Sequence, residues 1–558
     1  MTKCLVSNTE NCKNCYKCIR NCPIKAISFE NNRAAIIHEN CILCGSCYNV
    51  CPQKLKKVRN DVFAVKRLIE GGKVYVSLAP SFVSYYANSD IQCMRETLRK
   101  LGFEDVEETA VGATIVKKAY DEMLNSGRDV VISSCCHSIN LLIRKYHPEC
   151  LKYLADVLSP MCAHGLNLKQ RYGSNAKVVF IGPCISKKDE GDNSDYIDAV
   201  LTFRELDEWL EKEKIVLETT NEKAQDERSK ARFFPETGGI LKTMERSSKI
   251  HDYIAVDGVQ NAIHTLEDLE AGKIHNCFIE MSACVGSCIN GPISRREETS
   301  ILSRQLLIDR YAGSEDFPLE QITSDDIRTR YDRSANIRYT PTEAQIEDML
   351  KKMNKEDPRE RLNCGCCGYE SCREKAIAII NGHANIDMCL PLLMEKSKSL
   401  SDNIIENTPN GLMALDADLN IGLINRSMCR ILDIRDPKDV IGQHLAMVMD
   451  PSDFYDVFEG KNIRRKKEYL AEYEKYIEKT ISFDKKFNIL VCVIRDITTE
   501  EMSKHAHKEL VDNTISITDS LLEKNMTSVH EIASLLGETV AETKVALEKL
   551  KGLVKTDE

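Results

Sequence analysis

The spacing of the cysteines constrains this 558-residue chain more than any other feature of its sequence. Two stretches near the N-terminus repeat the pattern CxxCxxCxxxCP. Three thiolates within seven residues can hold three corners of one 4Fe–4S cubane, while the fourth thiolate comes from the other repeat. The repeats therefore predict two cluster sites, with the ligands Cys12, Cys15, Cys18 and Cys51 at one and Cys41, Cys44, Cys47 and Cys22 at the other.

This duplication, with Pro23 and Pro52 closing the two repeats, resembles the bacterial ferredoxins with two 4Fe–4S clusters. The alternative is a pair of zinc sites, which would use two CxxC pairs per metal and no CP ending. Neighbouring cubanes transfer electrons and carry out no bond chemistry. A ferredoxin-like domain over residues 1–62 therefore implies a redox centre elsewhere in the chain.

Composition favours metal clusters over disulfides for the 25 cysteines. The N-terminus has no export signal and the cysteines bunch at metal-ligand spacings, so we expect a reducing compartment. The net charge of −10, from 76 basic and 86 acidic side chains, argues against a nucleic-acid partner. Because no apolar run approaches the ~18 residues of a membrane helix, we expect no membrane partner and a cytoplasmic protein of several domains.

Residues 63–335 alternate β-rich runs with amphipathic helical stretches, which predicts an α/β domain. We expect buried strands at 73–80, 129–134 and 176–183, and helices that include 92–101 and 115–125. In such domains, ligands bind at the carboxyl ends of the strands. Three segments follow predicted strands directly, and they are Ala79-Pro80-Ser81, Cys135-Cys136 and Pro183-Cys184.

Three cysteine segments of this domain resemble the signature segments of the iron-only (FeFe) hydrogenases. The family reads TSCCPxW, MPCxxKxxE and ExMACxxxC, and this chain reads SSCCHS at 133–138, GPCISKKDE at 182–190 and EMSACVGSC at 280–288. The resemblance implies a cubane held by Cys136, Cys184, Cys284 and Cys288. It also implies that Cys288 bridges to a two-iron subcluster with carbon monoxide and cyanide ligands, which completes the H-cluster.

The same resemblance implies roles for residues around the two-iron subcluster. Lys187 would donate charge-assisted hydrogen bonds to a cyanide, and Pro80, Ser81 and Pro183 would help to bind the cofactor. Cys135 matches the family's proton-donating thiol, whose ordinary pKa of about 8.5 allows proton exchange near neutral pH. The predicted catalytic residues are Cys135, Lys187 and Glu190.

Simpler interpretations exist for several of these residues. Lys187 and Glu190 are spaced as a solvated i,i+3 ion pair on a helix. Four other cysteines of this region fit buried apolar thiols, and they are Cys93, Cys150, Cys162 and Cys277.

The departures from the family pattern predict altered chemistry. Gly182 and Ser282 stand where the family has methionines, which implies a more open and more polar pocket. The helical carboxylates of the family's proton path have no clear counterpart, because Asp121 and Glu122 are out of register. A broken relay would slow turnover, so we expect a low-turnover enzyme that senses hydrogen or redox state.

Residues 336–400 predict a small helical domain with a further cluster. Thr340-Pro341 with Glu343 predicts a capped helix start. Cys364, Cys367, Cys372 and Cys389 resemble the CxxCGxxxC…CxP module of several redox proteins, and Cys366 is left as a spectator. Four thiolates suit a cubane, and a structural zinc site is the alternative.

Residues 401–500 resemble a PAS sensor domain, from the run IIENTPNGLMALDADLNIGLINRSMCRIL to the closing VCVIRDITTEE. DADLN predicts a hairpin turn between alternating strands. Neither Cys429 nor His444 stands in a context that identifies a cofactor, so we expect a packed core without a ligand.

Residues 501–558 predict a helical signalling segment with an apolar seam. The seam residues alternate spacings of four and three, and they are Val529, Ala533, Leu536, Val540, Thr543, Leu547, Leu550 and Val554. Such a heptad pattern favours a homodimeric coiled coil, and packing of the helix on its own PAS domain is the alternative. By analogy with PAS systems, a kinase or phosphatase is the expected output partner.

Together these features predict a multidomain α/β and α+β protein with three accessory 4Fe–4S clusters and an H-cluster. The first hypothesis is a sensory FeFe-hydrogenase-like enzyme that interconverts H2 with protons and electrons, exchanging electrons with a redox partner such as ferredoxin. A second is a non-catalytic iron–sulfur scaffold or electron carrier without the two-iron part. A third is an ordinary hydrogen-producing enzyme whose PAS domain only assembles partners.

Overall fold

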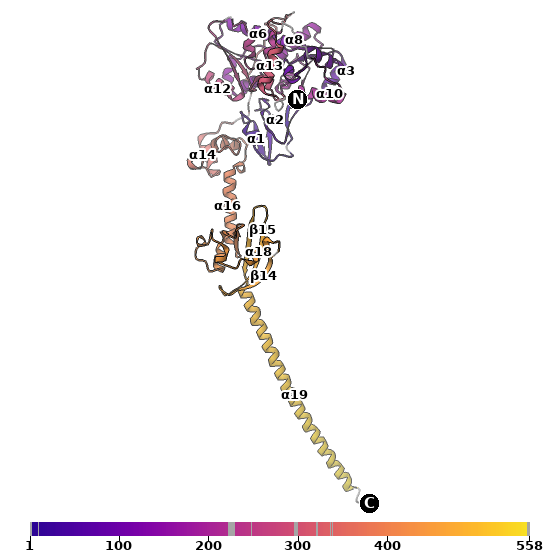
Figure 1. Ribbon diagram of the computed structural model, residues 1–558, viewed down its shortest axis with the longest axis vertical. Helices are drawn as coiled ribbons and strands as arrows, with labels where there is room; N and C mark the ends of the chain where they lie inside the picture. Colours follow the sequence, from indigo (N-terminus) through magenta and orange to yellow (C-terminus); the bar gives the residue numbers. More distant parts are fainter. Residues whose placement is uncertain are drawn as a thin grey trace. The chain divides into compact units, whose positions relative to one another are not determined.

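The computed structural model describes residues 3–8, 10–220, 229–246, 248–294, 299–319, 322–334, 336, 339–461 and 463–554. The chain divides into two compact units, Met1–Leu393 and Met394–Glu558 (Figure 1). The domain boundary expected at residue 335 lies outside the described residues. None of the helices within the described ranges is long and apolar enough to cross a membrane.

The N-terminal domain is built twice on one plan, as the cysteine repeats predict. Each repeat ends in a short helix that carries its third cysteine, α1 (Lys17–Arg20) and α2 (Ser46–Val50). Two antiparallel pairs complete it, β1 (Leu5–Ser7) with β4 (Lys56–Val58) and β2 (Ile27–Glu30) with β3 (Arg33–Ile36). Asn31 and Asn32 join β2 to β3 with φ of 49° and 59°, the left-handed conformation of a tight hairpin turn.

Two parallel sheets form the α/β domain and confirm its predicted class. One has the order β6 (Asp105–Glu108), β5 (Val74–Leu78), β8 (Lys177–Gly182) and β9 (Ala199–Thr202). The other has the order β10 (Asp252–Asp257), β11 (Cys277–Ser282) and β7 (Val130–Ile132). The strands β5 and β11 are buried along their whole length, because parallel sheets are covered on both faces.

Helices connect these strands, and two of them match the helical stretches that the sequence predicts. The helices are α3 (Val62–Gly71), α4 (Phe82–Tyr85), α5 (Ile91–Lys100), α6 (Ala110–Asn125), α7 (His137–Tyr146), α8 (Pro160–Tyr172), α9 (Ser186–Asp192), α10 (Phe203–Glu213), α11 (Gly239–Thr243), α12 (Val259–Glu270) and α13 (Ile301–Tyr311). α6 begins five residues before the predicted stretch. It includes Gly112, where a Cβ atom would collide with the Pro160 carbonyl and His164 of α8, so tight helix packing requires the glycine there.

The last part of the first unit is a small helical module. It contains α14 (Glu343–Lys352) and α15 (Cys372–Ile380), and α16 (Leu390–Asn407) begins directly after Cys389. The helix start predicted at Thr340 is two residues early. The capping box is formed by Thr342 and Gln345 instead, because Gln serves at the third helical position as well as Glu.

The second unit contains an antiparallel sheet and a long helix. The strand order is β13 (Ile421–Ile424), β12 (Gly411–Leu415), β16 (Ile489–Asp496), β15 (Lys475–Asp484) and β14 (Ile463–Leu470), with α17 (Arg426–Ile431) and α18 (Ser452–Phe458). The predicted DADLN turn joins β12 to β13, and the Asp416 carboxylate accepts hydrogen bonds from the Asp418 and Asn420 amides at 2.9 and 2.8 Å.

The C-terminal segment is a single helix, α19 (Thr498–Val554) (Figure 1). Its first turns touch β15, where the His505 ring lies 6.2 Å from the Tyr476 ring. All side chains from Met502 to Gly552 are exposed. From Met502 to Gly552, the helix therefore does not bury a face against its own PAS domain, which was the alternative to a coiled coil.

Candidate metal centres

Four hollows in the first unit are each lined by one of the predicted cysteine sets. We name them the Cys12 set (Cys12, Cys15, Cys18, Cys51), the Cys41 set (Cys22, Cys41, Cys44, Cys47), the Cys136 set (Cys136, Cys184, Cys284, Cys288) and the Cys364 set (Cys364, Cys367, Cys372, Cys389). The structure thus brings together every predicted group of four, and ligation of iron by these sulfurs stays a prediction.

The arrangement of these sulfurs fits a multi-iron cluster. A tetrahedral zinc site would hold four sulfurs about 2.3 Å from one ion. Across the described ranges, no three His, Cys, Asp or Glu side chains are arranged to hold a single ion. The sulfurs instead surround a hollow, and four thiolates around such a space match the ligand requirement of a 4Fe–4S cubane.

Backbone amides near the ferredoxin-like sets point at the sulfurs. The amides of Ala26, Leu43 and Leu55 donate to Cys22, Cys41 and Cys51 at 3.2, 3.3 and 3.4 Å. Hydrogen bonds to a thiolate stabilise its charged form. These backbone amides therefore favour the thiolate form of the three sulfurs.

The Cys136 set is assembled from the carboxyl ends of three parallel strands. Cys136 follows β7 and directly precedes α7, Cys184 follows β8, and Cys284 follows β11. Cys288 lies in the short 3-10 helix η3 (Ser287–Asn290). This is the edge at which α/β sheets bind ligands, and Pro183 lines the same hollow.

Lys187 and Glu190 form a buried ion pair rather than the solvated pair that their spacing allows. Their side chains are 12% and 11% exposed, and Lys187 Nζ lies 2.5 Å from Glu190 Oε2. Burial alone lowers the pKa of Lys187, but the Glu190 carboxylate raises it above its ordinary value. Lys187 Nζ also donates to the Cys135 carbonyl oxygen at 3.1 Å, so the ammonium is fixed beside the predicted proton donor.

Ser81 is a buried hydroxyl with an unused hydrogen-bonding capacity. It follows Pro80 at the carboxyl end of β5 and is 1% exposed. Its Oγ has no hydrogen-bond partner among the described residues. A buried polar atom without a partner is unfavourable by itself, so this hydroxyl fits a site that receives a polar ligand.

Cys135 differs from the free thiol that its expected role assumes. Burial raises the pKa of its thiol to about 12, above the ordinary thiol value of about 8.5, and its role as a proton donor stays a prediction. The Tyr120 hydroxyl lies 3.3 Å from the Cys135 sulfur and accepts a hydrogen bond from the Ser134 amide at 2.9 Å. Sequence reasoning missed Tyr120, whose only signal was its place in the helix that should supply a carboxylate.

The carboxylates of Asp121 and Glu122, which the sequence offered for a proton path, form hydrogen bonds away from Cys135. Asp121 accepts a hydrogen bond from the Glu245 amide at 3.3 Å, and Glu122 accepts one from Ser324 Oγ at 2.9 Å. Glu280 is a buried carboxyl near Cys135, and burial raises its pKa to about 7. Its oxygens accept from the amides of Gly238 and Leu241, so this carboxyl holds the α11 segment.

The positions where family methionines are replaced have different consequences. A Cβ atom at Gly182 would lie 2.7 Å from the Phe180 ring and 3.1 Å from the Ala79 methyl. Phe180 therefore fills the space, and the expected opening of the pocket is wrong at this position. Ser282 lines the hollow of the Cys136 set, but its hydroxyl donates to the Cys284 carbonyl at 3.3 Å.

The Cys364 set lies in the helical module, where Cys366 shares its hollow. Cys364 and Cys366 are exposed, whereas Cys367 and Cys389 are buried. Lys375, which is 1% exposed, also lines this hollow and donates to the Ile386 carbonyl at 2.9 Å. A buried ammonium beside thiolates favours the more negative state of any cluster held there.

The cysteines predicted to be apolar thiols are buried, and they are Cys93, Cys150, Cys162 and Cys277. In the PAS domain Cys429 is also buried, and His444 Nδ1 accepts from the Ala446 amide at 3.2 Å. This bond caps the short helix η7 (Leu445–Met447), which is a structural role for His444.

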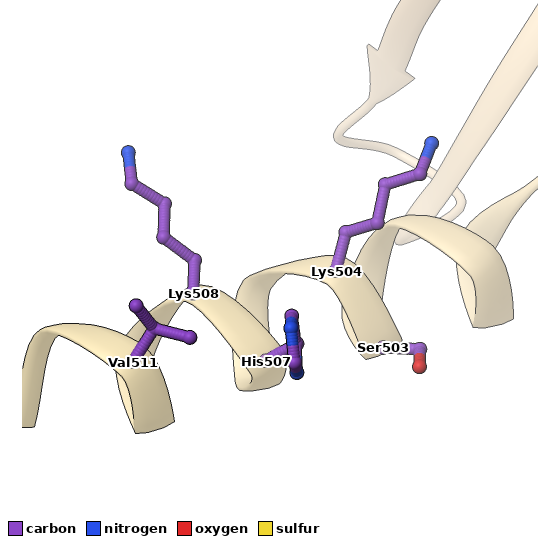
Figure 2. A pocket seen from close by; sticks show the side chains of 5 residues that line it. All are labelled: Ser503, Lys504, His507, Lys508 and Val511. Atoms are coloured by element: carbon purple, nitrogen blue, oxygen red, sulfur yellow. The ribbon is translucent and has the colours of Figure 1, made fainter. Parts of the chain in front are cut away.

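A shallow depression on α19 does not resemble a ligand site. Figure 2 shows the five side chains that line it on successive turns of this one helix, Ser503, Lys504, His507, Lys508 and Val511. All five are exposed. The four hollows lined by the cysteine sets all lie in the first unit.

Four protein-family models match separate stretches of the chain. The model for the C-terminal domain of the iron-only hydrogenase large subunit matches residues 72–252 and 247–292. A 4Fe–4S dicluster domain matches residues 4–52, an Fe–S cluster family matches 360–391, and the PAS fold matches 400–506. No curated protein matches the chain.

Several solved structures are similar to parts of the chain. A variant of the FeFe-hydrogenase HydA1 from Chlamydomonas reinhardtii is 17% identical, with 50% of this chain and 100% of that chain covered and a TM-score of 0.39. The structure titled for stepwise H-cluster assembly in HydA(deltaEFG) is 17% identical, with the same coverage and a TM-score of 0.38. The PAS domain of an HTR-like protein from Haloarcula marismortui is 19% identical and covers 19% of this chain and 95% of that chain, at a TM-score of 0.16.

The family models and the cysteine sets agree on the same residue ranges. The chain is therefore a multidomain protein in which the C-terminal domain of an iron-only hydrogenase large subunit is joined to a 4Fe–4S dicluster domain, a further Fe–S cluster domain and a PAS domain.

Proposed function

We propose that this protein binds an H-cluster at the Cys136 set and interconverts H2 with protons and electrons at low turnover, as a sensor of hydrogen or redox state. The observation that carries the proposal is the convergence of four cysteines from three distant segments on one hollow. Lys187 and Glu190 are buried close to Cys135, as the resemblance requires. A bare cubane would need neither of them.

Each residue around the site has a task that its contacts support. The Cys136 set would hold the cubane, and Cys288 would also hold the two-iron part. When bound, the cofactor supplies the redox and Lewis-acid chemistry of H2 splitting. Lys187, oriented by Glu190 at 2.5 Å, would donate to an anionic ligand, and the Ser81 hydroxyl would add a second donor.

Proton transfer would begin at Cys135 and is the step that limits turnover. The Cys135 sulfur lies within hydrogen-bond distance of the buried phenol of Tyr120 rather than of a carboxylate. A phenol has an ordinary pKa near 10, and burial raises the pKa of Tyr120 further. General acid–base catalysis works best when the pKa of the group lies near the working pH, so Tyr120 is a poor relay.

The second unit would convert the state of the site into a signal. α16 begins at the residue after Cys389 and ends four residues before β12 of the PAS sheet. We propose that the chain forms a homodimer through the exposed seam of α19 and passes its signal by contact to a kinase or phosphatase. A ferredoxin-like protein is the proposed electron partner.

Infrared spectroscopy tests the proposed cofactor directly. After anaerobic maturation, the full chain should show bands from carbon monoxide and cyanide bound to iron. Cys288→Ser should abolish these bands, whereas the control Cys150→Ala, at a buried cysteine outside the hollow, should keep them. Fully loaded protein without the bands would instead be an electron carrier. Turnover with reduced dye at the rate of bulk hydrogen producers would refute the low-turnover part of the proposal.

A further inference from the structure

The loop that carries Cys364 and Cys367 is fastened to the first ferredoxin-like repeat. Arg20, at the end of α1, donates to the carbonyl oxygens of Gly365 and Cys366 at 3.4 and 3.2 Å. Lys25 Nζ donates to the Gly368 carbonyl at 3.3 Å, and the Phe29 amide donates to the His383 carbonyl at 2.9 Å. These bonds hold the helical module directly against the strand and helix that surround the Cys12 set.

The backbone of the helical module comes close to helix α1 at Gly368. This residue has a φ of +94°, and a Cβ atom there would lie 2.9 Å from Ile19 Cγ2. Ile19 is the neighbour of Cys18, and Gly368 is the neighbour of Cys367. Cys12, Cys18 and Tyr16 pack against the same apolar cluster that contains Ile19 and Cys367, so the Cys364 set lies beside the Cys12 set.

At its other end, the ferredoxin-like domain touches the hydrogenase-type site. Cys44 lines both the hollow of its own set and the hollow of the Cys136 set. A Cβ atom at Gly45 would lie 2.5 Å from Pro292 Cγ, and Pro292 lines the second hollow. Lys145 Nζ donates to the Cys41 carbonyl at 2.8 Å and joins the two domains there.

The four sets therefore lie in a row along the first unit. The order is the Cys364 set, the Cys12 set, the Cys41 set and the Cys136 set. The helices α1 and α2, which carry Cys18 and Cys47 of the two middle sets, pack against each other. The outer set is also the one with two exposed cysteines in its loop, Cys364 and Cys366.

We propose that the helical module at 360–391 is the outer end of one electron relay and reaches the hydrogenase-type site only through the Cys12 and Cys41 sets. Only the inner end of this relay rests on the proposed function. A cluster held by one cysteine set would lose one electron to a cluster held by the next set, with no bond made or broken. The two electrons released when H2 is oxidised to two protons would leave singly at the module, to a one-electron acceptor such as an oxidised viologen.

Magnetic coupling between reduced clusters tests this order without any H2 chemistry. The full chain, loaded with iron and sulfide and reduced with dithionite, should show an electron paramagnetic resonance signal from the Cys364 set with spin–spin broadening. Removing the neighbouring site with Cys15→Ser should abolish that broadening, whereas Cys44→Ser should leave it intact. The reverse result, or no broadening in the unaltered chain, would overturn the proposed order.

A pair of glycine variants tests the contact without touching a ligand. Gly368→Ala and Gly382→Ala both place a Cβ atom on a backbone with positive φ, at +94° and +71°. Only the first would collide with Ile19, because nothing lies within 4 Å of a Cβ at Gly382. Weaker coupling in Gly368→Ala alone supports the relay, and equal coupling in both variants contradicts it. Coupling that is present in protein without carbon monoxide bands would reject the proposed function and keep the relay.

Discussion

The Tyr120 hydroxyl lies 3.3 Å from the sulfur of Cys135, and Tyr120 is fully buried whereas Cys135 is half-buried. Tyr120 projects from α6, the helix in which the resemblance leads us to expect a carboxylate. It also accepts the Ser134 amide at 2.9 Å and lies 3.0 Å from Ser134 Oγ. The phenol therefore fixes the segment that presents Cys135, and it offers no group that ionises near neutral pH.

Substitutions of Tyr120 should separate its structural role at the Ser134 amide from its effect on proton transfer. In Tyr120→Phe the buried Ser134 amide loses its acceptor, so we expect a loss of ~1–3 kcal/mol in unfolding free energy and no gain in turnover. Tyr120→Glu keeps an acceptor and adds a titratable carboxyl, so we expect faster H2 turnover, within the ~10²–10⁴-fold range of general acid–base catalysis. Denaturant unfolding and dye-linked assays measure the two quantities. Tyr455→Phe, at an exposed tyrosine, is the control, and equal turnover of Tyr120→Glu and the unaltered chain would show that another step is limiting.

The buried pair of Lys187 and Glu190 leads to a prediction about the stability of the protein and about the infrared bands of the bound cofactor. Glu190→Gln leaves the Lys187 ammonium buried without its carboxylate partner, which typically reduces stability by ~3–5 kcal/mol. We expect that loss in denaturant unfolding, together with shifted cyanide bands in the infrared spectrum because Lys187 is no longer oriented. The matched control is Glu213→Gln, whose partner Lys66 is 40% exposed. Unshifted bands in Glu190→Gln would mean that Lys187 does not contact the ligand.

The sequence predicts which cysteines lie together better than it predicts the surroundings of those cysteines, for a physical reason. Cysteine spacing groups Cys51 with Cys12 and Cys22 with Cys41, because three thiolates within seven residues leave one corner of a cubane for a thiolate of the other repeat. The environment of Cys135 depends on which side chain α6 turns toward it, and a shift of one residue decides between Tyr120 and Asp121. The space beside Gly182 likewise depends on the rotamer of Phe180, which no sequence pattern specifies.

Asp121 should make stability depend on pH. Its Oδ1 is buried without a hydrogen-bond partner among the described residues, and burial raises its pKa from 3.8 to about 6. Since the folded state binds this proton more tightly than the unfolded chain, stability falls as the pH rises from about 4 to about 6 and is lowest above that range. Two pKa units correspond to at most ~3 kcal/mol.

Asp121→Asn removes this titration, so the variant should gain the full difference in stability at pH 8 and only about half of it at pH 5, where the folded carboxyl is still mostly protonated. Denaturant unfolding of the full chain at both pH values measures the difference. Asp325→Asn, at a side chain that is 94% exposed, should change neither value. An equal effect of Asp121→Asn at both pH values would show that the carboxyl titrates normally.

The exposed seam of α19 predicts the oligomeric state. A helix of 57 residues extends for ~85 Å at 1.5 Å per residue, and isolated helices are marginal in water without a packing partner. Its exposed apolar residues include Leu536, Val540, Leu547 and Leu550 at heptad spacing. A second copy provides a matching seam of the same length and the same residues, so we expect a dimer by light scattering coupled to size exclusion.

Charged residues in the seam should dissociate this dimer. Leu536→Asp and Leu547→Asp each place a carboxylate where two identical helices meet, and like charges in a desolvated seam repel. We expect a shift toward the monomer mass in both variants. Glu538→Asp and Glu548→Asp lie off the seam and should remain dimeric. A mass that stays at twice the chain mass in the seam variants would place the dimer contact elsewhere, and a monomeric unaltered chain would contradict the coiled coil itself.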